Sequence, residues 1–193
     1  MGCALIVNVV GGMLIGAWQG ARAGSRRDRT TSTALLVLCS LPEFWLALVL
    51  LVVFVHQHGW LPATGITDEM SSYMSTRQQF VDRVRHLVLP LTSLSLVGIA
   101  VFARYQRDAM EESMTQPFVR TARAKGLTEA AVRRQAWRTA LLPVITVTGL
   151  MLPALITGAV FVERVFAWPG MGFAMIRAIE ARDYPVVSAG VIL

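Results

Sequence analysis

The sequence predicts an all-α fold, a polytopic transmembrane helix bundle. Hydrophobic residues make up 54% of the 193 residues and charged residues only 16%, and the mean hydropathy is +0.55. Soluble domains carry about a quarter charged residues. The charges are clustered, and the five longest stretches without any are 1–21, 30–42, 44–67, 87–103 and 139–162. About 20 apolar helical residues cross a membrane core about 30 Å thick, so several of these stretches are long enough to span it.

Polar segments separate the predicted membrane spans. We expect spans over residues 2–19, 31–55, 87–103 and 141–162, with the start of a fifth from 184. The first span is rich in glycine, which suits close helix packing in lipid, at Gly11, Gly12 and Gly16. The second contains Pro42, which breaks the helical hydrogen-bond ladder. The third continues as a charged helix to about Met114. The final run would rise only about 15 Å as a helix, so we expect the sequence to be a truncated form of a longer membrane protein.

The basic residues predict the orientation of the spans. Residues 22–30 and 104–140 carry 12 arginine and lysine residues, whereas 56–86 and 163–185 carry 6. Because cytoplasmic segments are enriched in basic residues, we place the first two segments in the cytoplasm and the other two outside. The net charge of +6 follows this membrane pattern, so we expect a lipid bilayer around the protein and no nucleic-acid partner. Cys3 and Cys39 lie in apolar runs and imply no disulfide framework.

The polar segment 116–140 carries the most informative local pattern. Gly126 has access to backbone angles that are closed to other residues, so it permits a sharp turn between two helices. Thr128 and Glu129 form a helix start, with a threonine N-cap and an acid in the first turn. The helix that follows has an apolar stripe beside a basic rim of Arg133, Arg134 and Arg138. Such a helix fits a groove in a partner protein. An amphipathic helix lying on the anionic inner leaflet is the alternative.

Four segments are informative together. In chain order they are Gly59-Trp60-Leu61-Pro62-Ala63, then Arg120-Thr121-Ala122-Arg123-Ala124-Lys125-Gly126-Leu127 with the basic helix that reaches Pro143, then Val165-Phe166-Ala167-Trp168-Pro169-Gly170-Met171-Gly172, and Arg182-Asp183-Tyr184-Pro185-Val186-Val187. With them the chain resembles the permease subunits of binding-protein-dependent ABC importers of the dipeptide, oligopeptide and nickel type. It departs from that pattern at Gln135 and Thr139, where histidine and asparagine are common, and at Glu43, where a neutral small residue is usual. The family's first transmembrane helix and the polar loop after it are missing.

The resemblance implies a fold, a location and partners. The fold is the type I ABC importer permease fold, in the bacterial plasma (inner) membrane. The chain would form half of the path for di- and oligopeptides or nickel. It would work with a second permease subunit, two ATPase subunits that bind the ATP, and an extracytoplasmic substrate-binding protein. Segment 116–140 would be the coupling loop that the ATPase grips, through Arg120, Thr121, Ala122, Arg123, Ala124, Lys125, Gly126, Leu127, Arg134 and Arg138.

The outer segment 163–183 and Glu43 are candidates for the substrate path. We expect a turn at Trp168-Pro169-Gly170 and a short helix over about 171–181. Phe166 and Trp168 suit an aromatic belt at the membrane interface, and the resemblance places them in a gate-like loop beside the path. Glu43 is the acid inside a predicted span, where a charge is costly unless it is paired or wet. Three roles are open for Glu43. Its carboxylate faces the path and contacts a peptide's amino group, or it pairs with a basic group of the partner subunit, or it takes up a proton and is neutral.

Other functions are less well supported by the sequence. His56, His58 and His86 suggest a metal site, but no acid or cysteine cluster accompanies them, so we expect none. The sequence contains no phosphate-binding loop, zinc-protease motif or nucleophile elbow, so we expect neither an enzyme nor a cofactor of its own. An ion-coupled transporter would carry ionisable residues in several spans, whereas only Glu43 qualifies. A nonfunctional truncated permease stays open.

Overall fold

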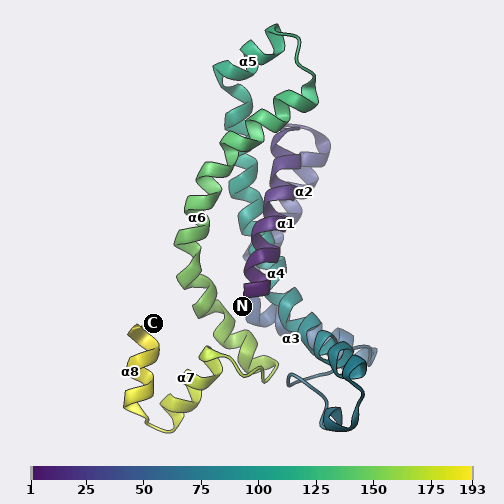
Figure 1. Cartoon of the computed structure of the whole chain (residues 1–193), viewed down its shortest axis with the longest axis vertical. Coiled ribbons are helices and arrows are strands. Elements are labelled where there is room, and N and C mark those ends of the chain that lie inside the picture. The colour runs from purple at the N-terminus through teal and green to yellow at the C-terminus, as the bar shows by residue number, and fades with distance from the viewer. Residues whose placement is uncertain (1, 193) are drawn as a thin grey trace. The chain divides into compact units, whose positions relative to one another are not determined.

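The computed structural model describes residues 2–192, apart from the side chains of residues 152–159 and 191–192. All regular structure in this part of the chain is helical, which confirms the all-α prediction. The helices are α1 (Gly2–Gly20), α2 (Arg26–Ser40), α3 (Glu43–Leu51) with a π-helical turn (Val52–Gln57), a 3-10 turn (Ser71–Tyr73), α4 (Thr76–Thr115), α5 (Pro117–Ala124), α6 (Glu129–Val165), α7 (Met171–Glu180) and α8 (Tyr184–Ile192) (Figure 1).

The chain divides into two compact units. The amino-terminal unit consists of residues 2–41 and 95–152, and the carboxy-terminal unit consists of residues 42–94 and those from 153 onward. Helices α4 and α6 contribute to both. The cytoplasmic segments predicted from the sequence, 22–30 and 104–140, therefore both belong to the amino-terminal unit.

Among the residues that the structure describes, two helices, α1 and α4, are long and apolar enough to cross a membrane, and α2 with α3 adds a third if the two are one broken span. The break follows from Pro42, because Leu41 before it takes an extended conformation and proline donates no hydrogen bond. The predicted span 141–162 lies within α6. With 40 residues, α4 is about 60 Å long, so its charged end projects beyond a membrane core.

Helix α4 begins at Thr76, well before the span predicted at 87–103 and inside the polar segment 56–86. The backbone N–H of Ser75 donates to Oε1 of Gln78 at 3.0 Å, and the Ser75 hydroxyl donates to the same oxygen at 2.9 Å. This is one half of a capping box, with glutamine three residues after the N-cap serine. This local signal marks the beginning of α4 at Thr76.

The amino-terminal unit is held together by close contact of α1 with α4. Gly12, Gly16 and Gly20 follow one another at every fourth residue and face the α4 backbone. A side chain at Gly16 would meet the Cβ of Gln106 at 2.7 Å, and one at Gly20 would meet the Cβ of Met110 at 2.7 Å. The predicted close packing of the glycine-rich helix is confirmed, because only glycine leaves room for α4 at these positions.

A separate core stabilises the carboxy-terminal unit. Ala47 of α3, Leu89 of α4 and Val162 of α6 are almost completely buried and pack with Phe166. The backbone N–H of Gly65 donates to the carbonyl oxygen of Phe166 at 2.9 Å, which attaches the segment between α3 and α4 to the end of α6.

Candidate functional site

Helix α5 ends in a tight turn at Gly126. The N–H of Leu127 donates to the carbonyl of Ala122 at 3.2 Å, and the N–H of Gly126 donates to that of Arg123 at 2.9 Å. These two bonds define a Schellman motif, in which the first of the two donor residues takes a left-handed conformation. Gly126 supplies it with φ of +78°. The sharp turn predicted from the sequence is confirmed.

The start of α6 is fixed by its own neighbours. The N–H of Ala131 donates to the Thr128 hydroxyl at 3.4 Å, which is the predicted threonine cap. Across the turn, Nε and Nη2 of Arg123 donate to the two carboxylate oxygens of Glu129 at 2.8 and 3.2 Å. The hydrogen bond from Arg123 lowers the pKa of Glu129. Both side chains are exposed, so the pair orients the turn in solvent.

The apolar side of α5 is already covered by the protein itself. Val119 and Ala122 pack on Val132 of α6, and all three are nearly inaccessible to solvent. A second cluster joins α4 to α6 just behind them, through Ala109, Met110, Ala136 and Ala140. The two helices and the turn therefore form one packed element, which projects beyond the ends of α1 and α2 (Figure 1).

Two open grooves flank Gln135 on this element. One has a volume of about 530 Å³ and is lined by Ala130, Ala131, Gln135 and the predicted Arg134 and Arg138. The other has a volume of about 380 Å³ and is lined by Phe118, Gln135 and the predicted Thr121, Ala122, Lys125 and Leu127. The structure thus brings six of the ten predicted coupling residues to the two grooves.

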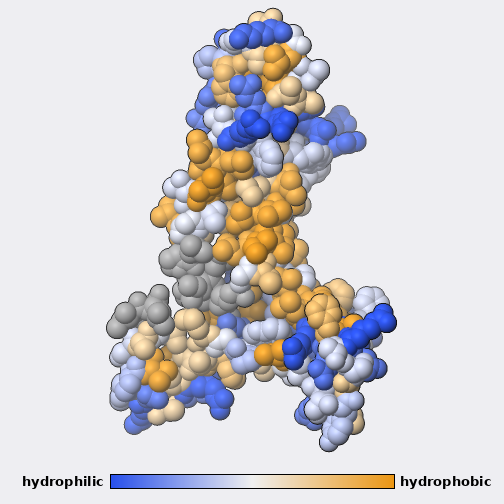
Figure 2. All heavy atoms as spheres, viewed as in Figure 1, coloured by the Kyte–Doolittle hydropathy of each residue, from blue (hydrophilic) through white to orange (hydrophobic). Residues whose placement is uncertain are grey.

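The remaining predicted coupling residues lie on the exposed outside of the turn. They are Arg120, Arg123, Ala124 and Gly126. Of all ten residues only Ala122 is buried. Figure 2 shows hydrophilic and hydrophobic residues side by side over α5 and its turn, and below them a band of hydrophilic residues next to a hydrophobic surface of the amino-terminal unit. This element offers a basic, protruding surface with two recesses for another protein's side chains.

The three residues predicted for a substrate path occupy different environments in the carboxy-terminal unit. Phe166 is only 2% exposed and belongs to the apolar core, so its ring supports the fold. Trp168 and Glu43 are half-buried. Glu43 lies in the first turn of α3, where the helix dipole favours a negative charge. No hydrogen bond or ion pair in the described part of the chain joins these three side chains.

The turn after α6 depends on Glu163, which the sequence analysis did not single out. Glu163 is 6% exposed, and its Oε2 accepts a hydrogen bond from the backbone N–H of Phe173 at 3.0 Å. That N–H belongs to the first turn of α7, whose N-cap, Gly170, has no side chain to accept it. A Cβ at Gly170 would overlap the Glu163 carboxylate. The predicted turn and the predicted short helix, found here as Met171–Glu180, are confirmed.

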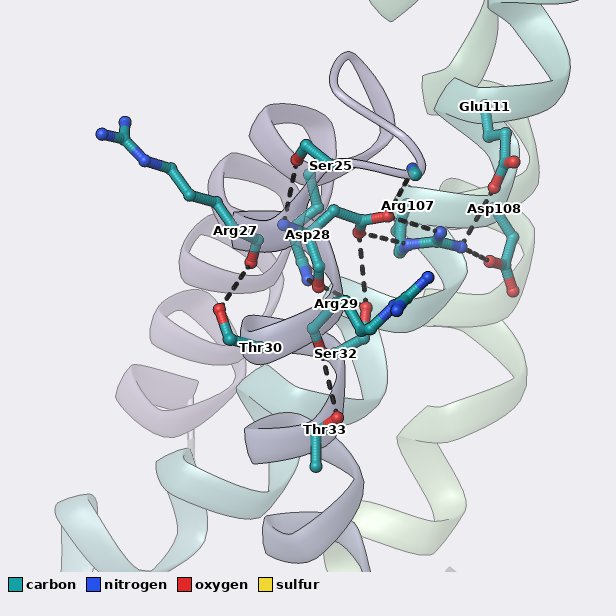
Figure 3. A network of polar contacts seen from close by, with 12 residues as sticks. Ser25, Arg27, Asp28, Arg29, Thr30, Ser32, Thr33, Arg107, Asp108 and Glu111 are labelled. Atoms are coloured by element: carbon teal, nitrogen blue, oxygen red, sulfur yellow. Dashed lines mark hydrogen bonds and ion pairs between the residues drawn. The ribbon is translucent and has the colours of Figure 1, made fainter.

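A second unpredicted feature is a buried ion pair in the amino-terminal unit. Arg107 of α4 donates from Nε and Nη2 to the two carboxylate oxygens of Asp28 at 2.8 and 2.9 Å (Figure 3). The two residues are 79 positions apart in the sequence. Asp28 is also held by the backbone N–H of Gly24 at 2.9 Å. Such a pair has no local signal, since its partners meet only when α2 packs on α4.

The histidines have separate surroundings. Nδ1 of His86 lies 3.2 Å from the carboxylate of Asp82 one turn earlier in α4. The ring of His58 lies against Trp60, with centroids 4.6 Å apart. Within the residues that the structure describes, no three histidine, cysteine or acidic side chains form a group suited to a metal ion.

Comparison with known proteins gives a consistent picture. A family model described as "Binding-protein-dependent transport system inner membrane component" matches residues 12–193. The chain is 41% identical to a di/tripeptide transport system permease protein of Pseudomonas aeruginosa, over 94% of this chain and 58% of that protein. It is 36% identical to an oligopeptide transport system permease protein of Bacillus subtilis, over 96% of this chain and 56% of that protein.

A dipeptide transport system permease protein of Escherichia coli is 34% identical, over 99% of this chain and 61% of its own length. The chain therefore spans somewhat more than half of the length of these curated relatives.

Proposed function

Because the chain belongs to the family of binding-protein-dependent transport system inner membrane components, we propose that it is the permease subunit of an ATP-driven importer of di- and oligopeptides. It forms half of the translocation path. The match over residues 12–193 supports the class, and the names of the three relatives support peptides as the substrate. Nickel is the alternative substrate that the sequence resemblance leaves open.

The element formed by α5, the Gly126 turn and the start of α6 is the coupling site in this proposal. ATP is bound by a separate ATPase subunit, two copies of which serve two permease subunits. A substrate-binding protein delivers the peptide from outside. The ATPase grips α5, and its closure on ATP moves α5 as a lever. The Schellman turn and the Val119–Val132 packing make the element rigid enough to transmit that movement.

The single observation that favours a protein partner over a lipid surface is the burial of the apolar side of α5. A helix that lies on a membrane inserts its apolar face between the lipid headgroups. In α5 that face, Val119 and Ala122, is used against α6, and the arginine and lysine side chains remain outside with the two grooves. A partner with acidic side chains that enter the grooves beside Gln135 fits this surface.

The substrate path is proposed to pass Glu43 and the turn at Trp168. Glu43 at the start of α3 is placed to attract the amino group of a peptide, and Phe166 serves as the wall behind the turn. Glu43→Gln in the full-length permease should change the preference among peptide substrates without changing the amount of protein in the membrane. Unchanged uptake of every peptide would remove Glu43 from the path.

The coupling proposal is tested with Gly126→Asp and Arg120→Glu in the full-length permease with its partners. We expect normal membrane levels and a loss of uptake by about ten-fold or more, because an energetic coupling of 1–3 kcal/mol is removed. Gly59→Asp is the matched control for Gly126, since Gly59 also has a positive φ and open space around it. Arg104→Glu is the control for Arg120. Normal uptake by both coupling variants would contradict the proposal.

A further inference from the structure

The ion pair of Asp28 with Arg107 is the most completely connected polar group in the amino-terminal unit. Asp28 is 3% exposed, and its oxygens also receive the backbone N–H of Gly24 at 2.9 Å and the hydroxyl of Ser32 at 3.4 Å. Its own N–H donates to the Ser25 hydroxyl at 3.1 Å, which caps α2. Figure 3 shows the carboxylate of Asp28 and the guanidinium of Arg107 pointing toward each other between α2 and α4.

Arg107 is held on its other side by its own helix. Its Nη1 lies 3.0 Å from the carboxylate of Asp108 and 3.0 Å from that of Glu111. Both residues of the pair lie outside the predicted spans, in the predicted cytoplasmic segments. The hydrogen bond from Arg107 lowers the pKa of Asp28 to about 2, so the pair is ionised at neutral pH. The guanidinium is thereby fixed in position and orientation, which a flexible ammonium group would not be.

The pair lies close to the proposed coupling site. Arg107 comes eight residues before the end of α4 at Thr115, about 12 Å along the helix, and α5 begins two residues later. On the same stretch of α4, Met110 packs in the cluster that contains Ala136 and Ala140 of α6. Gly20 at the end of α1 also contacts Met110. The last part of α4, residues 107–115, leads into the coupling element and is called the α4 stalk below. The α1–α2 hairpin is thus attached to this stalk by an apolar contact and by a bidentate ion pair.

We propose that Asp28 and Arg107 are a positioning pair, which makes the α1–α2 hairpin move as one body with the α4 stalk when the ATPase displaces the coupling element. This role rests on the proposed function. Two parallel hydrogen bonds resist both sliding and rotation of α2 against α4, whereas the close packing of the α1 glycines on α4 involves no directional bond from their missing side chains. Without the pair, α4 would move and the α1–α2 hairpin would not move with it. Less substrate would then be transported for each ATP that is hydrolysed.

The experiment measures substrate transported per ATP hydrolysed by the full-length permease, assembled with its partner subunits in lipid vesicles. Arg107→Lys keeps the charge and removes the paired hydrogen bonds. We expect it to lower transport per ATP by about five-fold or more, while ATPase subunits still co-purify. Arg104→Lys is the matched control, because Arg104 is exposed on the same helix three residues earlier and makes no ion pair with any described residue.

The double variant D28N/R107Q separates positioning from stability. It removes both charges, so it should recover most of the thermal stability that either single neutral variant loses. We expect transport per ATP to stay low in the double variant. The positioning role alone would be overturned if Arg107→Lys transported a normal amount of substrate per ATP. It would also be overturned if the double variant recovered both its stability and its transport per ATP. Absence of ATPase subunits from the wild-type complex would overturn the proposed function, and the pair's role with it.

Discussion

Two arginine–carboxylate pairs of the amino-terminal unit, Arg107–Asp28 and Arg123–Glu129, have the same shortest distance, 2.8 Å, and different surroundings. The side chains of Arg107 and Asp28 are 22% and 4% exposed, and those of Arg123 and Glu129 are 47% and 56% exposed. One pair lies between two helices that are remote in sequence, and the other spans a turn of six residues. Two ion pairs of the same length therefore differ in what they join, since one connects two helices and the other connects the two sides of a turn.

The difference shows that burial, and not bond length, decides what an ion pair contributes. Water screens the charges of an exposed pair, and many such pairs stabilise a fold very little. A buried pair is costly to assemble, yet removal of one partner leaves an uncompensated charge and is strongly destabilising. If the Gly126 turn is the coupling site that we propose, its exposed pair can exchange its partner for one on another protein, whereas the buried pair joins α2 to α4 within the fold.

The largest effect is expected when the buried pair loses one partner. Asp28→Asn should destabilise the purified permease by about 1.5–3 kcal/mol, because the guanidinium of Arg107 loses the bidentate carboxylate that joins α2 to α4 and keeps only Asp108 and Glu111 of its own helix as ion-pair partners. Thermal unfolding in detergent measures this as a lower melting temperature. A melting temperature equal to that of the wild type would show that the pair's surroundings are as well solvated as those of Arg123 and Glu129.

Acid should weaken the buried pair within a defined range of pH. The pKa of Asp28 is lowered from 3.8 to about 2 in the folded protein by the hydrogen bonds from Arg107. Since the folded value is the lower one, the stabilisation is complete above pH 3.8 and is lost as the pH falls toward 2. The stability difference between wild type and Asp28→Asn should shrink over this range in thermal unfolding. A difference that is constant from pH 5 to about 2 would contradict the assignment.

Glu163 is an intermediate case, because its buried carboxylate accepts a hydrogen bond from a backbone N–H instead of pairing with an arginine. Glu163→Ala should cost about 1–2 kcal/mol, because the N–H of Phe173 loses its acceptor and the first turn of α7 loses its cap. Glu163→Gln keeps an acceptor oxygen at the same place and should cost less. Proteolysis near Gly170 measures the loosening of the turn. Equal cleavage of the alanine variant and the wild type would exclude the capping role.

The smallest effect is expected at the exposed pair. Glu129→Gln should leave the melting temperature unchanged within error, because both side chains are surrounded by water. Any effect should be confined to the affinity for the ATPase, measured by co-purification. A clear fall in the melting temperature would show that the coupling turn depends on this ion pair for its fold.

Local signals carried most of what the sequence predicted correctly. Gly126 and Thr128 act through residues at most five positions away, so their patterns can be recognised along the chain. The helix start at Ser75 and Gln78 had an equally local signal, which the polar composition around it obscured. The break at Pro42 was also predicted from a single residue.

Features that depend on helix packing were missed for a physical reason. Asp28 meets Arg107 only after α2 and α4 have packed, and either residue alone resembles an ordinary charge near a membrane surface. Glu163 looked like one more polar residue at a span end, although it caps a helix ten positions later. The burial of Phe166 in a core was also not predicted, because its type and position in the sequence do not show that it packs against Ala47 and Leu89.

The central claim is that α5 and its turn face the cytoplasm and are held by an ATPase subunit. Photo-crosslinking groups at Thr121 and at Glu69 test it in cells that express the full-length permease with its partners. Both side chains are exposed, and the sequence predicts opposite sides of the membrane for them. We predict an ATPase adduct from position 121 and none from 69. Adducts with lipid alone at 121, or labelling of 121 from outside the cell, would contradict the account.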